Sequence, residues 1–362
     1  MTSKTTITPK PRNSNLELFR IIVMLLIVAH HYVVNSGLPS IMAENPTSTK
    51  SMFLYLFGWA GKTGIDCFVL ITGYFMCKSN ISLRKFLKLF GAFYLYKIVF
   101  FTIFATTGYA ELTLKFVIKS LVPFRSVDYG FVSCYLVFFC FIPFLNILIK
   151  GMNKKQHQLL MGLCLVAFSV FPQLLIKVSH NHVWWYMVIY LIGSYFRLYP
   201  PQWSLNAKRT GYLTTVLITL SLASVRGGVQ MSSIFNKDLS YFFIEDSNKP
   251  LAVATAVCAF LFFKNLKISY SKVINTIAAS AFGVLLIHAN SDTMRQWLWR
   301  DTLDNAGHYA GNIYLHAIVS VLVVYAVCTI IDMLRIKLIE KPLFKWFDNH
   351  SKQKNDLMEK NV

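Results

Sequence analysis

Long apolar stretches separated by short polar segments run along almost the whole chain. A helix that crosses a bilayer needs about twenty mainly apolar residues. Ten stretches approach or reach that length, and they cover residues 17–36, 63–77, 86–107, 130–149, 157–176, 183–199, 209–226, 250–265, 273–290 and 311–335. The pattern predicts an all-α membrane protein, a bundle of about ten transmembrane helices.

The positive residues alternate from one connecting segment to the next. If the N-terminus is cytoplasmic, the segments on the inner side hold 24 of the 36 Lys and Arg residues, and those on the outer side hold 11. Cytoplasmic loops of membrane proteins are enriched in Lys and Arg. We therefore expect both termini in the cytoplasm, with residues 1–347 forming an integral membrane domain and 348–362 a short polar cytoplasmic tail.

Composition excludes a soluble fold. Apolar residues make up 55% of the chain and charged residues 14%, against about 25% charged in an ordinary globular protein. The net charge of +20 would suggest nucleic acid in a soluble protein, but here the basic loops account for it and no nucleic-acid partner is expected. The cysteines form no C-x-x-C pair and no zinc-type spacing, so no metal site is predicted.

Two ionisable residues lie on one face of the first apolar stretch. Arg20 and His31 are separated by about three helical turns, roughly 16 Å, whereas His30 points to a different side. In one interpretation Arg20 reaches lipid headgroups and His31 lies at the interface. In the other, Arg20 holds an anionic donor and His31 acts as a general base.

Five segments, in this order along the chain, resemble the signatures of acyltransferase family 3. They are Leu18-Phe19-Arg20 followed, after ten intervening residues, by His31, then 64–75 (GIDCFVLITGYF), Tyr135 with 142–146 (IPFLN), 282–288 (FGVLLIH) and Glu340-Lys341-Pro342. Thr72 stands where the family usually has Ser, which keeps the hydroxyl group. Each segment is weak alone, but five in order form a fairly specific signal.

The resemblance implies an O-acyltransferase of the bacterial plasma membrane. Such an enzyme transfers an acyl group, usually acetyl, from cytoplasmic acyl-CoA to a hydroxyl of a cell-surface or lipid-linked glycan. Acyl-CoA is then a co-substrate and no bound cofactor is expected; the other partners are the glycan acceptor and membrane lipids. His31 would be the general base, or would form an acyl-histidine. Arg20 would contact the donor phosphates, with the pantetheine arm running towards His31.

Further candidates for binding the donor or the acceptor are Asp66, Thr72, Gly73, Tyr74, Lys97, His288 and Glu340. Thr72, Tyr74 or Lys97 could donate a hydrogen bond to the oxyanion. Asp66 could orient a histidine or pair with Lys97, and a structural ion pair is equally compatible. His288 is expected either at a wet interface or at the acceptor. Glu340 is expected to bind the basic inner surface or the donor.

Two other functions remain open from the sequence. A polytopic transporter or flippase of a lipid-linked glycan or small solute would also have many spans and intramembrane charges. Alternatively, the chain could carry the acyl group across the bilayer for a separate transferase. The aromatic clusters at 184–186 and 297–299 are expected in an interfacial belt, although aromatic rings also stack on sugars.

Overall fold

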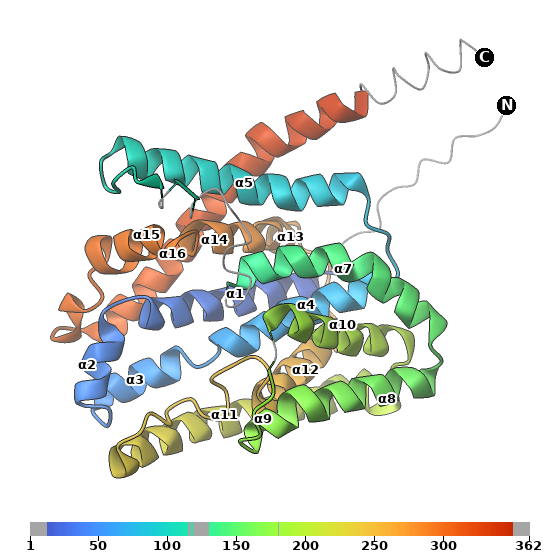
Figure 1. The fold of residues 1–362 in the computed structure, drawn as a ribbon, viewed down its shortest axis with the longest axis horizontal. Coiled ribbons are helices and arrows are strands. Elements are labelled where there is room, and N and C mark those ends of the chain that lie inside the picture. Colours follow the sequence, from blue (N-terminus) through green and yellow to red (C-terminus); the bar gives the residue numbers. More distant parts are fainter. Residues whose placement is uncertain (1–12, 115–116, 119–129, 180, 350–362) are drawn as a thin grey trace. The chain divides into compact units, whose positions relative to one another are not determined.

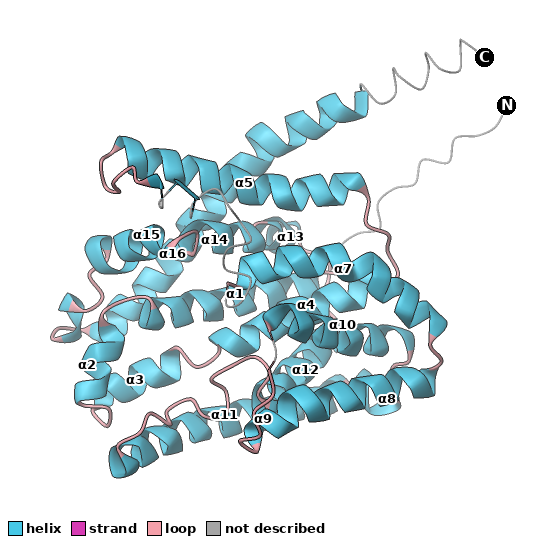
Figure 2. Ribbon diagram, viewed as in Figure 1, coloured by secondary structure: helices cyan, strands magenta, loops and turns pink. Residues whose placement is uncertain are grey.

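The structure is a computed structural model that describes residues 13–114, 117–118, 130–179 and 181–349. All regular secondary structure in these residues is helical (Figure 2). This confirms the predicted all-α class. Most of the predicted tail, 350–362, lies outside the described residues.

Figure 1 shows the helices in their order along the chain. Among the described residues the chain begins with α1 (Ser14–Val34), α2 (Leu38–Glu44), α3 (Thr49–Phe57), α4 (Gly61–Met76), α5 (Leu83–Thr106), α7 (Phe131–Gly151) and α8 (Lys154–Leu165). The π-helical turn η2 (Val166–Val170) continues α8 into α9 (Phe171–Gln173), and α10 (His182–Leu198), the short η3 (Gln202–Leu205), α11 (Ala207–Phe235) and α12 (Pro250–Asn265) follow. The last elements are α13 (Lys272–Ala279), α14 (Ala281–His288), α15 (Asp292–Gln296), η4 (Trp297–Thr302), η5 (Gly307–Tyr309), α16 (Ile313–Arg335) and η6 (Ile336–Glu340).

Polar side chains mark where many of these helices begin. The preceding residue accepts a hydrogen bond from a backbone N–H of the first turn, which satisfies a donor that has no partner inside the helix. Helices capped in this way, with the capping residue, are α3 (Ser48), α5 (Ser82), α8 (Asn153), α10 (Asn181), α11 (Asn206), α15 (Ser291) and α16 (Asn312). At the other end, α11 stops at Asn236, whose backbone is left-handed with φ 50°.

The chain divides into two compact units that interleave along the sequence. Unit 1 comprises residues 1–27, 59–78 and 144–279, and unit 2 comprises 28–58, 79–143 and 280–362. The helix α1 is continuous, so its first turns belong to unit 1 and its last turns to unit 2.

In unit 1, α4 packs against α10 and α12, α11 packs on α12, and α8 packs on α10. The contact between α4 and α10 is close because glycines face each other across it. A Cβ atom on Gly73 would lie 2.6 Å from the Tyr190 carbonyl oxygen, and one on Gly193 would lie 2.6 Å from that of Leu70. Only a residue without a side chain fits at either position.

In unit 2, α14 packs against α16 and α5, and α16 also contacts α3. The crossing of α14 and α16 depends on Gly283. A Cβ atom there would lie 2.1 Å from the carboxylate of Asp332 on α16. The backbone of α14 therefore rests directly on an acidic side chain, five residues before His288.

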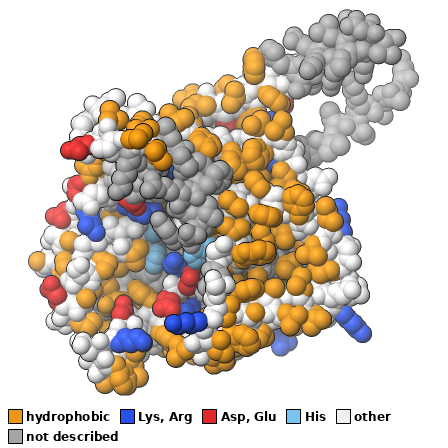
Figure 3. All heavy atoms as spheres, in the orientation of Figure 1, with side chains coloured by type: hydrophobic (Ala, Val, Ile, Leu, Met, Phe, Trp, Pro, Cys, Tyr) orange, Lys and Arg blue, Asp and Glu red, His pale blue; other side chains and the backbone are white. Residues whose placement is uncertain are grey.

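The structure confirms that the chain contains several helices long and apolar enough to cross a membrane. Among the described residues, six helical segments are long and apolar enough to cross a membrane, and a bent pair, Lys272–His288 with Asp292–Thr302, could be a seventh. The six are Ser14–Val34, Thr49–Met76, Leu83–Thr106, Phe131–Gly151, Ala207–Phe235 and Ile313–Asn349. Apolar side chains cover much of the face drawn in Figure 3, as expected of a surface that contacts lipid.

Each of the ten predicted stretches nevertheless falls on helix. The stretches outside the six long segments correspond to α10, with 17 residues, to α12, with 16 residues, to the run from α8 to α9, and to the broken pair of α13 and α14. Short or broken helices of this kind are compatible with a span only where neighbouring helices satisfy the backbone.

Candidate active site

Two histidines from opposite ends of the sequence form a hydrogen-bonded pair in unit 2. Nδ1 of His31, near the end of α1, lies 2.9 Å from Nε2 of His288, at the end of α14. The imidazole of His288 is fully buried, and that of His31 is partly exposed. The sequence selected both residues separately but did not predict that they meet.

The hydrogen bonds of His288 fix the roles of all four ring nitrogens. Its Nδ1 lies 2.7 Å from the carbonyl oxygen of Val284, which can only accept, so Nδ1 carries the proton. In neutral His288 the lone pair is then on Nε2, and Nδ1–H of His31 donates to it. Neutral His31 therefore carries its own lone pair on Nε2. That is the arrangement of a base held by a second residue.

Aromatic side chains surround this pair. The ring of Trp299 meets the His288 ring edge-on, with centroids 6.3 Å apart, and meets the ring of Tyr32 in the same way at 6.0 Å. The Tyr32 hydroxyl hydrogen-bonds Nδ1 of His316 at 2.7 Å. Packing on several sides limits rotation of the His288 imidazole, which a positioning group requires.

Lys97 on α5 reaches the same end of α14. Its ammonium donates a hydrogen bond to the backbone carbonyl of Asn290, two residues after His288. The ammonium also lies 5.7 Å from the centroid of the Phe93 ring. A positive charge in a membrane-spanning helix is costly and typically marks a site.

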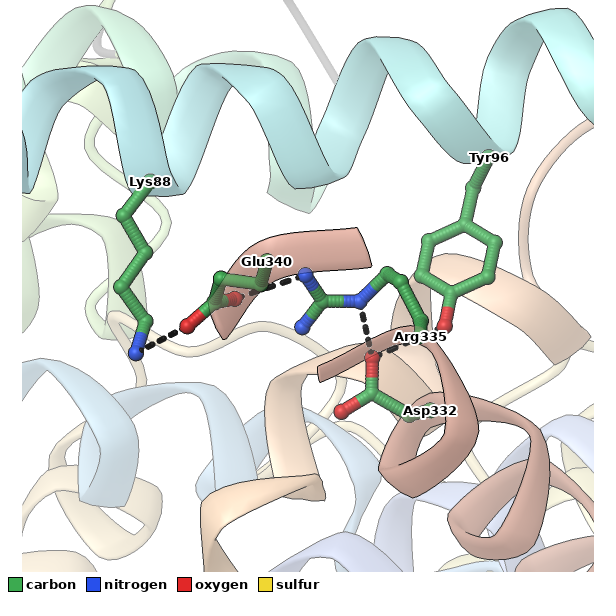
Figure 4. A network of polar contacts seen from close by, with 5 residues as sticks. All are labelled: Lys88, Tyr96, Asp332, Arg335 and Glu340. Carbon is green, nitrogen blue, oxygen red and sulfur yellow. Dashed lines mark hydrogen bonds and ion pairs between the residues drawn. The ribbon is translucent and has the colours of Figure 1, made fainter. Parts of the chain in front are cut away.

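A chain of ion pairs links α5, α16 and η6 (Figure 4). The carboxylate of Glu340 contacts Nζ of Lys88 at 2.6 Å and Nη1 of Arg335 at 2.7 Å. Nε of Arg335 also donates to Asp332 at 2.7 Å, and the Tyr96 hydroxyl donates to the same carboxylate oxygen at 2.8 Å. Glu340 thus contacts two basic side chains, and its binding to the basic inner surface or to the donor remains a prediction. The sequence did not single out Asp332 and Arg335 as site residues.

Arg20 and Asp66 belong to unit 1 and have partners there. Arg20 forms an ion pair with Glu17, one turn earlier on α1, at 3.0 Å. Asp66 on α4 is fully buried and accepts a hydrogen bond from the indole N–H of Trp185 at 3.0 Å. The sequence suggested neither partner, and a pairing of Asp66 with Lys97 remains a prediction.

The remaining candidates on α4 have local contacts. The Thr72 hydroxyl donates to the carbonyl of Phe68 one turn earlier at 3.0 Å. Gly73 makes the close helix contact described above. The Tyr74 hydroxyl accepts a hydrogen bond from Arg197 at 3.0 Å, with the guanidinium 4.8 Å from its ring centroid. These contacts give Thr72, Gly73 and Tyr74 structural roles. A role of the three residues in binding substrate remains a prediction.

Burial bears on two of the expectations. His288 is fully buried where α14 packs against α16 and α5, which disagrees with a wet interface, while its alternative role at the acceptor remains a prediction. In the aromatic clusters Trp185, Tyr186 and Trp299 are buried and Trp184 and Trp297 are exposed, and their place in an interfacial belt remains a prediction. A buried aromatic residue and an interfacial one have the same sequence signal, since both are flanked by apolar residues.

Among the described residues, no group of three or more His, Cys, Asp and Glu side chains is arranged to hold a metal ion.

Comparison with known proteins gives one match. The model of acyltransferase family 3, described as an acyltransferase domain, matches residues 13–333, nearly the whole chain. No curated protein and no solved structure matches. The matched range contains His31, His288 and the buried Asp332. The chain belongs to acyltransferase family 3, a family of membrane acyltransferases.

Proposed function

We propose that the protein is an O-acyltransferase of the bacterial plasma membrane. It transfers an acyl group, acetyl by preference, from cytoplasmic acyl-CoA to a hydroxyl of a cell-surface or lipid-linked glycan. The observation that carries the proposal is the hydrogen-bonded pair of His31 and His288 in a chain of this family. The proposal includes about ten spans with both termini cytoplasmic, because the basic loops alternate in that register.

In the proposed reaction Nε2 of His31 takes the proton of the acceptor hydroxyl. The hydroxyl oxygen attacks the thioester carbonyl carbon and forms a tetrahedral intermediate. The carbon–sulfur bond then breaks, and the leaving thiolate takes the proton back from His31, which gives the ester and free CoA. No net proton is released, so one imidazole serves first as base and then as acid.

His288 supports both steps by accepting the hydrogen bond of His31 Nδ1–H. This bond holds the imidazole in the tautomer with the lone pair on Nε2 and stabilises the imidazolium that forms after proton transfer. Lys97 contributes positive charge at the same end of α14, which favours the oxyanion. Arg20, at the cytoplasmic start of α1, is assigned to the anionic part of the donor because guanidinium binds phosphate well.

The proposal is tested with labelled acetyl-CoA in membrane vesicles that contain the protein. We expect His31→Ala to lower the transfer rate by about 10²–10⁴-fold, the usual contribution of a general base. His30→Ala is the matched control: His30 is adjacent on α1, and its Nδ1 contacts the Gly58 carbonyl at 2.7 Å. We expect this control to retain transfer. Full transfer by His31→Ala in folded protein contradicts the assignment.

His288→Gln separates a positioning role from a merely structural one. We expect a lower rate and a displaced pH–rate profile, because the bond that sets the tautomer and the basicity of His31 is altered. An unchanged profile at a reduced rate would indicate packing alone. If the wild type moves the glycan across the membrane without incorporating label, the protein is a transporter.

A further inference from the structure

The last helix of the described chain is longer than the apolar part of a bilayer is thick. Ile313–Asn349 has 37 residues and is about 55 Å long, whereas the hydrocarbon core measures about 30 Å. Its first 23 residues, α16, suffice to cross that core. They hold two Lys, Arg, Asp or Glu side chains, while residues 336–349 hold five. Residues 336–349, which we call the terminal segment, therefore lie at the level of the lipid headgroups and beyond.

The acidic side chains of the terminal segment are paired with cations of α5. Glu340 contacts Nζ of Lys88 at 2.6 Å (Figure 4), and Asp348 contacts Nη1 of Arg84 at 2.8 Å. The guanidinium of Arg84 also lies 5.1 Å from the ring centroid of Phe344. The three residues of the terminal segment are four apart along the helix, so they share one face. That face is packed against α5, and its negative charges are compensated there.

The basic side chains of the terminal segment are on a different face. Lys337, Lys341 and Lys345 are also four apart and extend for about 12 Å along the helix. All three are exposed, and none forms an ion pair with a described residue. We call them the lysine stripe. Exposed apolar side chains accompany the stripe: Leu338, Ile339, Leu343, Trp346 and Phe347.

We propose that the lysine stripe binds the anionic headgroups of phospholipids. Each ammonium group can donate hydrogen bonds to phosphate oxygens, and no carboxylate of the described residues competes for it, because Glu340 and Asp348 are held by α5. The apolar side chains beside the stripe suit the acyl chains of the same lipids, and lysine stems can lie along them. Juxtamembrane basic segments are attracted to anionic leaflets in this way.

This inference goes beyond acyl transfer and does not depend on it. The segregation of charge is what supports it: the two carboxylates of the terminal segment are turned towards α5, and its three ammonium groups are left on the exposed side. A segment with the same composition but mixed faces would pair its own charges, since oppositely charged residues four apart on a helix attract each other.

Trp346 can report on the lipid next to the stripe, because it directly follows Lys345 and is 56% exposed. The protein is placed in vesicles of phosphatidylcholine and phosphatidylglycerol, of which one lipid at a time carries brominated acyl chains that quench tryptophan fluorescence. The quenching that is lost in Trp346→Phe belongs to this residue. One basic side chain near an anionic surface contributes about 1 kcal/mol, which is about fivefold in binding. We therefore expect phosphatidylglycerol to be preferred at Trp346 by at least about fivefold.

The variant Lys337→Gln with Lys341→Gln and Lys345→Gln removes the stripe. We expect the preference at Trp346 to fall below about twofold, because the remaining contacts are apolar and do not distinguish the two headgroups. The matched control is Lys150→Gln with Lys154→Gln and Lys155→Gln, which changes the net charge equally at three exposed lysines of unit 1. We expect this control to keep the preference. Size exclusion and thermal unfolding in detergent verify that both variants are folded.

Salt and a soluble phosphate compound complete the test. Raising NaCl from about 0.1 M to about 1 M shortens the screening length from about 10 Å to about 3 Å, so the wild-type preference should decrease. Equal quenching by the two lipids in wild type, or an equal loss in both triple variants, would overturn the proposal. Displacement of phosphatidylglycerol from Trp346 by free CoA would overturn it too, because the stripe would then hold a soluble phosphate compound instead of lipid.

Discussion

Among the described residues, each unit contains one fully buried aspartate on a helix that is a candidate membrane span, and the two have different hydrogen-bond partners. Asp66 in unit 1 accepts a single hydrogen bond from a neutral donor, the indole N–H of Trp185. Asp332 in unit 2 accepts two, from the Tyr96 hydroxyl and the Arg335 guanidinium, and so belongs to a network of charges. In both residues Oδ2 has no partner among the described residues. Burial alone therefore does not reveal whether a carboxyl group is part of an ionic network, because the partner decides it.

The largest loss of stability is expected from removing Asp332, the buried aspartate with a charged partner. We expect Asp332→Ala to lower the free energy of unfolding by about 3–5 kcal/mol, because it leaves the nearly buried Arg335 with half of its counter-charge. The side chains of Arg335 and Asp332 are 11% and 1% exposed, so solvent compensates little. Thermal unfolding in detergent measures the change. A loss no larger than that of Asp66→Ala would contradict the distinction between the two residues.

The glycines at the two helix contacts give the next largest effect. Overpacking by one methyl group costs about 1–3 kcal/mol, and we expect Gly73→Ala and Gly283→Ala both to destabilise. The obstacle differs, however: the new methyl meets the Tyr190 backbone in unit 1 and the Asp332 carboxylate in unit 2. The double variant Gly283→Ala with Asp332→Ala should therefore lose less stability than the sum of its parts, whereas Gly73→Ala should be additive with Asp332→Ala.

The helices were predictable because apolar periodicity determines them locally. All ten predicted stretches are helical, and the fold class follows from them. The sequence did not show that α10 and α12 have only 17 and 16 residues, or that 273–290 breaks between α13 and α14. Averaged hydropathy is insensitive to such details, because an interruption of a single residue, Ser280, inside an apolar stretch barely alters it.

The site was predictable residue by residue but not as an arrangement. His31 and His288 were both selected as ionisable groups at membrane depth, yet 257 residues separate them, and no local pattern encodes their contact. Asp332 was overlooked although it lies inside the last apolar stretch, 311–335. The criterion that selected Lys97, an ionisable residue within a span, would have found it.

A smaller effect is expected at the exposed end of the ionic network. Glu340 bridges Arg335 and Lys88, and the Lys88 side chain is 55% exposed. We expect Lys88→Gln to cost about 1 kcal/mol, since the ion pair formed by this largely exposed side chain contributes little. Raising the salt concentration should narrow the difference from wild type, and it should leave the effect of Asp332→Ala nearly unchanged. The same thermal assay at two ionic strengths tests both expectations.

The smallest effect is expected at Asp66, where the partner is neutral. Asp66→Asn keeps a carbonyl-type oxygen that can accept the Trp185 N–H, so we expect a loss below about 1 kcal/mol. Trp185→Phe removes the donor instead, and the coupling energy of the double variant measures this hydrogen bond alone. If Asp66→Asn retains stability and yet loses acyl transfer, its carboxyl group acts on substrate or on a catalytic side chain. If both are retained, this position needs an oxygen that accepts the Trp185 N–H and does not need a negative charge.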